Sequence, residues 1–159
     1  MTTPLSTFTA ALETAQTRAE AFDALGAYVA AELGVKLFTV STMNFDTMIA
    51  RRAWTSNAEA YPVSGDKPIE RDAFYEEVIE AGDCFIRNTL AEIAKVFPDH
   101  ELIGSLGLGS VLNIPVKLQG AQVGTLNLLD AEGFFYPARV ERAVDLLQVP
   151  AMACFLLPS

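Results

Sequence analysis

Two apolar runs that contain β-branched residues, 111–118 and 121–129, are separated by only Gln119 and Gly120. Each run has the length and composition of a β-strand. A two-residue connection that ends in glycine is typical of a tight hairpin turn, so the two strands are expected to pair antiparallel. This hairpin requires the chain to build its core around an antiparallel sheet.

The rest of the chain alternates between helical and strand-like patterns. Thr3-Pro4 and the pair Thr17 and Glu20 have the spacing of helix starts, and Gly34 and Gly82 are typical helix stops. The predicted helices cover 4–15, 17–33, 71–81, 89–106 with a break near Pro98, and 137–156 with a kink at Pro150. The further predicted strands cover 35–45, 48–55 and 84–87, and 56–66 is predicted to be a loop in which Ser64 is a turn former. This order predicts an α+β fold of three layers, in which the terminal helices cover one face of the sheet and the central helices and loops cover the other.

Composition limits the classes of partner. The chain has 159 residues, 51% of them hydrophobic, which suits a single domain over residues 1–159. A formal net charge of −9 disfavours binding to nucleic acid or to anionic membrane surfaces. The N-terminus does not have the pattern of a secretion signal, and the apolar C-terminal tail is too short to span a bilayer. We therefore expect a cytoplasmic protein without nucleic-acid or membrane partners.

Three segments resemble the sequence motifs of GAF domains. They are Gly109-Ser-Val-Leu-Asn-Ile-Pro-Val116, Val123-Gly-Thr-Leu-Asn-Leu128 after the turn at Gly120, and Glu80-Ala-Gly-Asp-Cys-Phe-Ile86. The resemblance covers nearly the whole chain and implies a five- or six-stranded antiparallel sheet. It also implies a ligand pocket between the sheet and the central helices, and a homodimer formed through the terminal helices. The function that follows is that of a small-molecule-binding sensor or regulatory domain.

The resemblance does not identify a cofactor. Cys84 is followed by Phe85 rather than by a histidine, so the Cys-His pair with which phytochrome-type members attach a bilin is missing. The Asn-Lys-Phe-Asp-Glu pattern of cyclic-nucleotide-binding members is missing as well. His100 is the single histidine, which excludes a multi-histidine metal site, and it is expected to be exposed in a helical turn. The cofactor therefore stays unknown at this stage.

The candidate ligand-binding residues are polar or aromatic side chains that lie next to the predicted sheet and loop. Asn113 and Asn127 bring amides into otherwise apolar strands, where they either line a pocket or bond to nearby loop backbone. Trp54, Tyr61 and Tyr75 supply aromatic rings with a polar group, and core packing is the alternative. The loop of residues 56–70 is the predicted lid. At most one of Arg51 and Arg52 can face the pocket, and exposure is the simpler expectation for both.

Two other functions stay open. One GAF subfamily uses cysteines to reduce free methionine sulfoxide, and Cys84 is the candidate thiol for such a thiol-dependent reductase. Buried packing is the simpler interpretation of Cys84. Cys154 is expected on the opposite face of the sheet, which predicts no disulfide between the two. The chain is therefore not expected to be an enzyme, and a ligandless dimerisation module is the third possibility.

The last predicted helix has more apolar positions than one sheet can cover. A second copy of the chain would cover the remainder in an isologous dimer. Leu147 and Phe155 are the positions that we expect in this interface.

Overall fold

The computed structural model describes residues 2–63 and 65–159, and its centre is a six-stranded antiparallel sheet. The strand order is β3-β2-β1-β6-β5-β4. The strands are β1 (Leu37–Asn44), β2 (Ile49–Thr55), β3 (Asp66–Pro68), β4 (Phe85–Arg87), β5 (Ser110–Leu118) and β6 (Ala121–Asp130). The antiparallel α+β architecture predicted from the sequence is confirmed.

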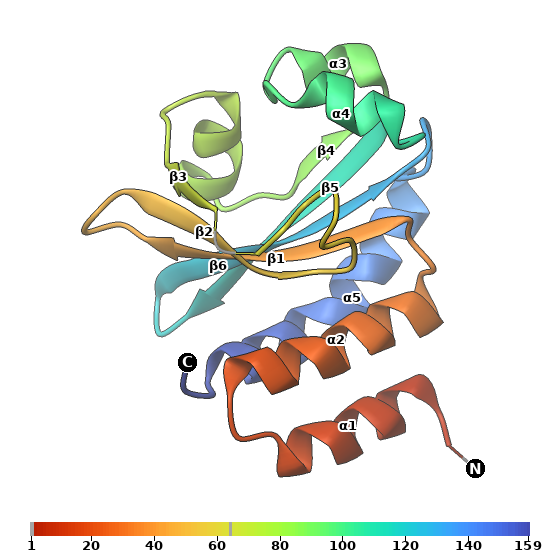
Figure 1. The fold of residues 1–159 in the computed structure, drawn as a ribbon, viewed down its shortest axis with the longest axis vertical. Helices are drawn as coiled ribbons and strands as arrows, with labels where there is room; N and C mark the ends of the chain where they lie inside the picture. The colour runs from red at the N-terminus through yellow and green to blue at the C-terminus, as the bar shows by residue number, and fades with distance from the viewer. Residues whose placement is uncertain (1, 64) are drawn as a thin grey trace.

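Helices cover both faces of the sheet (Figure 1). The first and last helices lie on one face, where α2 and α5 pack on the sheet and α1 packs on α2, and the central helices lie on the other. The helices are α1 (Pro4–Thr14), α2 (Arg18–Glu32), the π-helix η1 (Tyr75–Glu80), α3 (Leu90–Ala94), α4 (His100–Ser105) and α5 (Pro137–Phe155). Among the described residues, no helix combines the length and the apolar character needed to cross a membrane.

The predicted hairpin forms at Gln119 and Gly120. Both residues have positive φ, 55° and 78°, which is the backbone combination of a type I′ turn. The flanking residues Leu118 and Ala121 are paired directly. The register shifts once, between Val116 and Lys117, where β6 has one extra residue. Beyond this shift the pairing is regular, and it places Asn113 directly opposite Asn127.

The first two helices begin as their sequences predict. The Thr3 side chain accepts a hydrogen bond from the Ser6 N–H at 3.1 Å, and Thr17 Oγ1 accepts one from the Glu20 N–H at 3.3 Å. Each bond satisfies a backbone donor that the helix itself leaves unpaired. These caps fix where α1 and α2 start. The second helix ends at Glu32 with Leu33 as its C-cap, and Gly34, whose φ is +62°, follows the cap.

Side chains along each central strand point alternately to the two faces of the sheet, so the hydrophobic core has two parts, one on each face. Phe38, Val40, Leu126 and Leu128 point toward the terminal helices and belong to the larger hydrophobic cluster. Leu37, Val111 and Leu129 point the other way, toward α3, α4 and η1. Successive strand residues face opposite sides of a sheet. The side chains on the second face can therefore differ in kind from those on the first, and they can be polar as well as apolar.

Three local expectations need correction. The segment 56–66 is not all loop, because Asp66–Pro68 forms β3 at the sheet edge and pairs with β2. The helix expected over 71–81 is mainly the π-helix Tyr75–Glu80, in which Ala81 N–H donates to the Glu76 carbonyl five residues earlier. His100 is half-buried rather than exposed, at the start of α4. The predicted turn former Ser64 lies outside the described residues.

The two cysteines are both free, as expected, but the reason given for it is wrong. Cys84 packs at the margin of the cluster that contains Cys154, so the two thiols share one face of the sheet. Burial raises the pKa of the Cys84 thiol, and it raises the pKa of Cys154 to about 12.

We predict that native protein reacts with a thiol reagent at Cys84 only, and slowly. Cys154 is completely buried and stays a neutral thiol at ordinary pH, so it should react only after unfolding. Mass spectrometry of peptides after labelling in buffer and in denaturant would measure this. Equal labelling of both cysteines in native protein would contradict the burial of Cys154.

Candidate functional site

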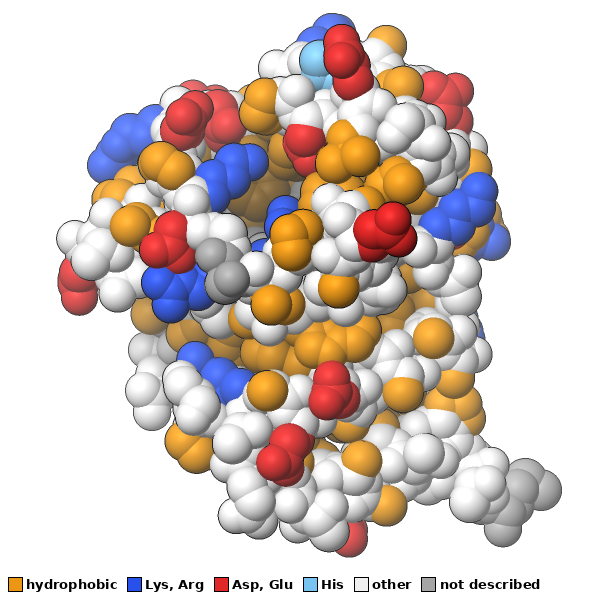
Figure 2. All heavy atoms as spheres, in the orientation of Figure 1, with side chains coloured by type: hydrophobic (Ala, Val, Ile, Leu, Met, Phe, Trp, Pro, Cys, Tyr) orange, Lys and Arg blue, Asp and Glu red, His pale blue; other side chains and the backbone are white. Residues whose placement is uncertain are grey.

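A cavity of about 250 Å³ lies on the face of the sheet that the terminal helices leave uncovered. Figure 2 shows its mouth as a hollow with apolar side chains inside and charged side chains around it. Its walls come from β1, β2, β3, β5 and β6, from the connection between β3 and η1, and from the connection between α3 and α4. Helix ends and loops therefore close a space whose floor is the sheet.

The floor contains a band of polar side chains that crosses three strands. Asn113 on β5, Asn127 on β6 and Thr39 on β1 stand opposite one another in register. Ser41 and Thr125 form the next pair along β1 and β6. All of these side chains line the cavity. The period of two along each strand brings them to the same face.

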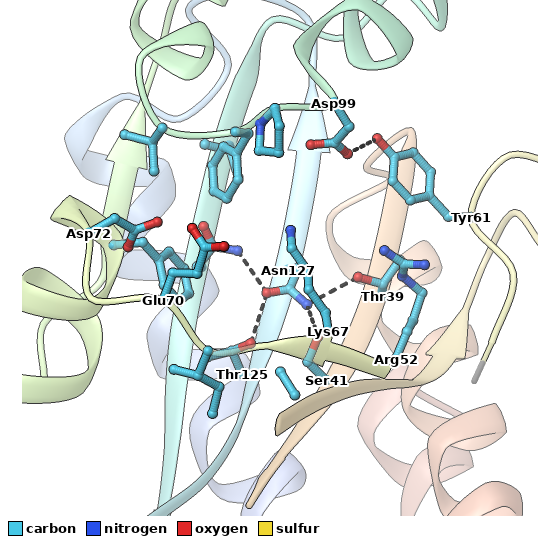
Figure 3. Close-up of a pocket in the computed structure, with 18 of the residues that line it drawn as sticks. Thr39, Ser41, Arg52, Tyr61, Lys67, Glu70, Asp72, Asp99, Thr125 and Asn127 are labelled. Carbon is cyan, nitrogen blue, oxygen red and sulfur yellow. Dashed lines mark hydrogen bonds between the residues drawn. The ribbon is translucent and has the colours of Figure 1, made fainter. Parts of the chain in front are cut away.

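Asn127 is the centre of this polar floor (Figure 3). Its Oδ1 accepts hydrogen bonds from Asn113 Nδ2 at 2.7 Å and from Thr125 Oγ1 at 2.9 Å. Its Nδ2 donates to Thr39 Oγ1 at 3.1 Å and to Ser41 Oγ at 3.0 Å. The partners are strand side chains, so the alternative of a bond to loop backbone does not apply to Asn127. The amide is fully satisfied and holds the floor in one arrangement.

Asn113 is different, because half of its amide has no protein partner. Its side chain is only 4% exposed, yet among the described residues nothing donates to Oδ1. A buried acceptor without a donor costs free energy, and such groups in folded proteins call for an explanation. The carbonyl oxygen of Asn113 is thus a buried acceptor without a protein donor, on a side chain that lines the cavity.

Tyr61 ties the predicted lid segment to the opposite wall. Its hydroxyl donates to Asp99 Oδ2 at 2.7 Å, and the Arg52 guanidinium lies 4.9 Å from the centre of its ring. Burial, and then the bond to Asp99, raises the pKa of Tyr61, so the phenol remains a donor at physiological pH. Tyr61 therefore joins β2, the 56–63 segment and the start of α4 across the cavity.

Charged side chains of both signs line the cavity around this floor. Arg52 and Lys67 are the cationic ones, and Glu70, Asp72 and Asp99 are the acidic ones. Arg52 and Asp99 are half-buried, whereas Lys67, Glu70 and Asp72 are exposed at the rim. No cluster of His, Cys, Asp or Glu with the arrangement of a metal site occurs within residues 2–63 and 65–159.

Three of the five predicted site residues line this cavity, and Trp54 does not. The Trp54 Nε1 donates to Asp23 Oδ1 of α2 at 2.7 Å, and the ring lies so close to Gly26 that a Cβ there would overlap it. The cause is a β-bulge, because Val40 pairs with Trp54 while Ser41 pairs with Arg52. One extra residue in β2 reverses the alternation, so Arg52 and Trp54 face opposite sides despite being two residues apart.

Tyr75 also falls outside the cavity, whereas Tyr61, Asn113 and Asn127 line it. Tyr75 is buried under the Arg71 guanidinium, 5.0 Å from its ring centre, and the preceding Phe74 lines the cavity instead. Of the two neighbouring arginines, Arg51 is exposed and pairs with Asp66 at 2.6 Å. Arg52 lines the cavity, so the expectation of exposure for both is wrong.

Several residues that line the cavity were not identified from the sequence. Thr39 and Ser41 are two residues apart on β1, and Thr125 is two residues before Asn127 on β6. Polar residues at every second position of a strand indicate a polar face of the sheet, so this signal is present in the sequence. Lys67 lies in the three-residue edge strand β3, and Glu70, Asp72 and Asp99 lie in short connections. In both places a charged residue is ordinarily an exposed one. Nothing local to these segments indicates that they converge.

The sequence matches no protein-family model and no curated protein, whereas its fold has many solved counterparts. The GAF domain of a two-component sensor histidine kinase from Bacillus halodurans superposes with a TM-score of 0.68 at 14% identity, covering 89% of this chain and 98% of that one. The GAF domain of an Acinetobacter phosphoenolpyruvate-protein phosphotransferase gives 0.71 at 13% identity, covering 98% and 96%. The chain has the GAF-domain fold. The chromophore-binding domain of a bacteriophytochrome from R. palustris gives 0.68 at 12% identity, covering 96% of this chain and 59% of that one.

The GAF fold agrees with the position of the cavity. The predicted pocket lies between the sheet and the central helices, and the observed cavity occupies that place. Because the identities are low, the solved counterparts establish the fold, and the function must be argued from the cavity itself.

Proposed function

We propose that this chain is a sensor or regulatory domain that encloses a small polar molecule in the cavity. The observation that carries the proposal is the unpartnered Oδ1 of the buried Asn113 in a polar floor. A small-molecule site combines apolar walls with a few converging polar groups, and this cavity has both. The similar folds include a sensor kinase domain and a chromophore-binding domain, which supports a signalling role.

The polar floor is difficult to explain by folding alone. Hydrogen-bonded amides and hydroxyls in a buried sheet face contribute no more to stability than well-packed apolar side chains of similar volume. The opposite face of the same strands is apolar in this way, with Val40, Leu126 and Leu128. A polar face opposite an apolar one indicates that Asn113, Asn127 and their neighbours serve recognition.

The reductase alternative lacks support from this cavity. Cys84 is not among the residues that line it, and burial raises rather than lowers the pKa of the thiol. A nucleophilic cysteine needs the reverse shift, toward thiolate at neutral pH. We therefore base the proposed function on binding.

We predict that Asn127→Leu removes ligand binding and lowers the free energy of unfolding by about 1–3 kcal/mol, because it leaves the buried partners of Asn127 without their bonds. Native mass spectrometry of freshly purified protein would detect a retained molecule, and denaturant titration would measure stability. Gln148→Leu likewise replaces a side-chain amide by leucine, at an exposed position of α5, and serves as the control. A retained molecule in the wild type that persists in Asn127→Leu would refute the assignment of this cavity.

We also propose that the domain acts as a homodimer, with an interface that differs from the one first expected. Leu147 and Phe155 are 0% and 3% exposed, so they are already covered within one chain. Val149 on α5 and Leu156, the residue that caps its C-terminal end, are 71% and 68% exposed. Their spacing of seven residues places them on one stripe of this helix. A partner helix on this stripe would bury both.

A further inference from the structure

The cationic end of the cavity is not neutralised by the protein. Arg51 has a carboxylate partner, Asp66, but no carboxylate lies within ion-pair distance of Arg52 or Lys67 among the described residues. Arg52 is half-buried, donates to the Pro62 carbonyl at 3.0 Å and stacks on Tyr61. A partly desolvated guanidinium that keeps donors free is a receptor for a carboxylate.

The other end of the cavity favours a positively charged donor. Asn113 Oδ1 can only accept, and it needs an N–H or O–H that the protein does not supply. Glu70 and Asp72 add negative charge at the rim, and Figure 3 shows both of them on the opposite side of Asn127 from Arg52. An ammonium group would supply the donor that this buried acceptor lacks, and it would also complement the charge of these carboxylates.

The sheet keeps these two ends apart. Arg52 is on β2 and Asn113 is on β5, with β1 and β6 between them. Three strand spacings amount to about 14 Å between the backbones, which the two side chains shorten from either end. A small molecule fits between them, with a carboxylate at one end and an ammonium group at the other side of the cavity. Phe97, Val111 and Leu129 offer apolar contact for the rest of it.

The charge balance of the lining argues against a strongly charged ligand. Two cationic side chains stand against three acidic ones, so neither a polyanion nor a polycation would find complementary charge throughout the cavity. Resting on the proposed binding function, we propose that the ligand is a small zwitterion with an apolar body. Its carboxylate binds at Arg52 and Lys67, and its ammonium group donates to Asn113 Oδ1 on the side of Glu70 and Asp72.

The test compares zwitterions with their one-charge counterparts. The standard proteinogenic amino acids are screened by thermal shift, and the best of them is compared by calorimetry with its deaminated acid and its decarboxylated amine. For L-phenylalanine these are 3-phenylpropionate and 2-phenylethylamine. We expect the zwitterion to bind at least about tenfold more tightly than either, because each counterpart leaves one charged end of the cavity unpaired.

Paired variants assign the two ends. Arg52→Gln should remove the preference for the zwitterion over the amine, and Glu70→Gln should reduce its preference over the acid. Arg51→Gln changes the neighbouring, outward arginine and should leave both preferences intact. If Arg51→Gln lowers affinity as much as Arg52→Gln, the assignment of the carboxylate end is wrong.

Failure of this inference differs from failure of the proposed function. The zwitterion inference is overturned if no amino acid binds, or if the acid or the amine binds as tightly. The proposed function survives either result when native protein retains another small molecule that Asn127→Leu releases. It fails when no molecule from a mixed extract of small metabolites binds at all.

Discussion

Leu147→Glu is expected to leave the chain unfolded in the absence of denaturant. Leu147 lies on α5 with no exposed surface, inside the cluster formed by α2, α5 and the sheet. A glutamate there would lose the packing of leucine and bury a carboxylate that no cation in the cluster can pair. The cost of several kcal/mol is comparable with the whole stability of a typical domain, about 5–15 kcal/mol. Circular dichroism and denaturant titration would measure the loss.

Val149→Glu, two residues further along the same helix, is the matched control. Val149 is 71% exposed, so the same charged residue should leave the fold intact. If the proposed dimer uses this stripe of α5, light scattering at micromolar concentration should show a dimer for the wild type and a monomer for Val149→Glu. A folded wild-type monomer under these conditions would exclude the proposed dimer, whereas a folded Leu147→Glu variant would contradict the packing of α5.

The sequence was sufficient for those elements whose signals are local. Gln119-Gly120 carries its own turn geometry, and Thr3 and Thr17 carry their own helix caps. Asn113 and Asn127 could also be identified locally, because a polar residue inside an apolar strand stands out in the sequence whichever strand it pairs with. These signals depend on neighbours within a few residues of the chain.

The misplaced residues depend on geometry that arises between segments. The bulge that turns Trp54 toward α2 exists only when β1 and β2 pair, and β2 contains no turn-forming residue from which it could be predicted. The π-helix η1 likewise places Phe74 rather than Tyr75 in the cavity wall. The rim charges converge because β3 joins the edge of the sheet, a long-range pairing that a three-residue strand cannot signal.

Gly124→Ala is expected to cost about 3 kcal/mol of stability, an overpacking effect at the upper end of the usual range. Gly124 on β6 pairs with Thr42 of β1, and a Cβ at Gly124 would overlap the Ser41 carbonyl oxygen as well as the Phe155 ring. The carbonyl belongs to the sheet backbone and cannot rotate away. Relief therefore requires β1 and β6 to separate locally, and thermal or denaturant unfolding would measure the cost.

The same change should weaken ligand binding, because the strands would separate where Ser41 and Thr125 contact Asn127 in the floor. Gly65→Ala is the control, since a Cβ there meets no described atom within 4 Å. That variant should be neutral or stabilised by about 0.5 kcal/mol, with unchanged binding. If Gly124→Ala were as stable as Gly65→Ala, the close approach of β1, β6 and α5 would be wrong. If it were destabilised and yet bound ligand with full affinity in its folded fraction, the floor around Asn127 would not be the part of the cavity that recognises the ligand.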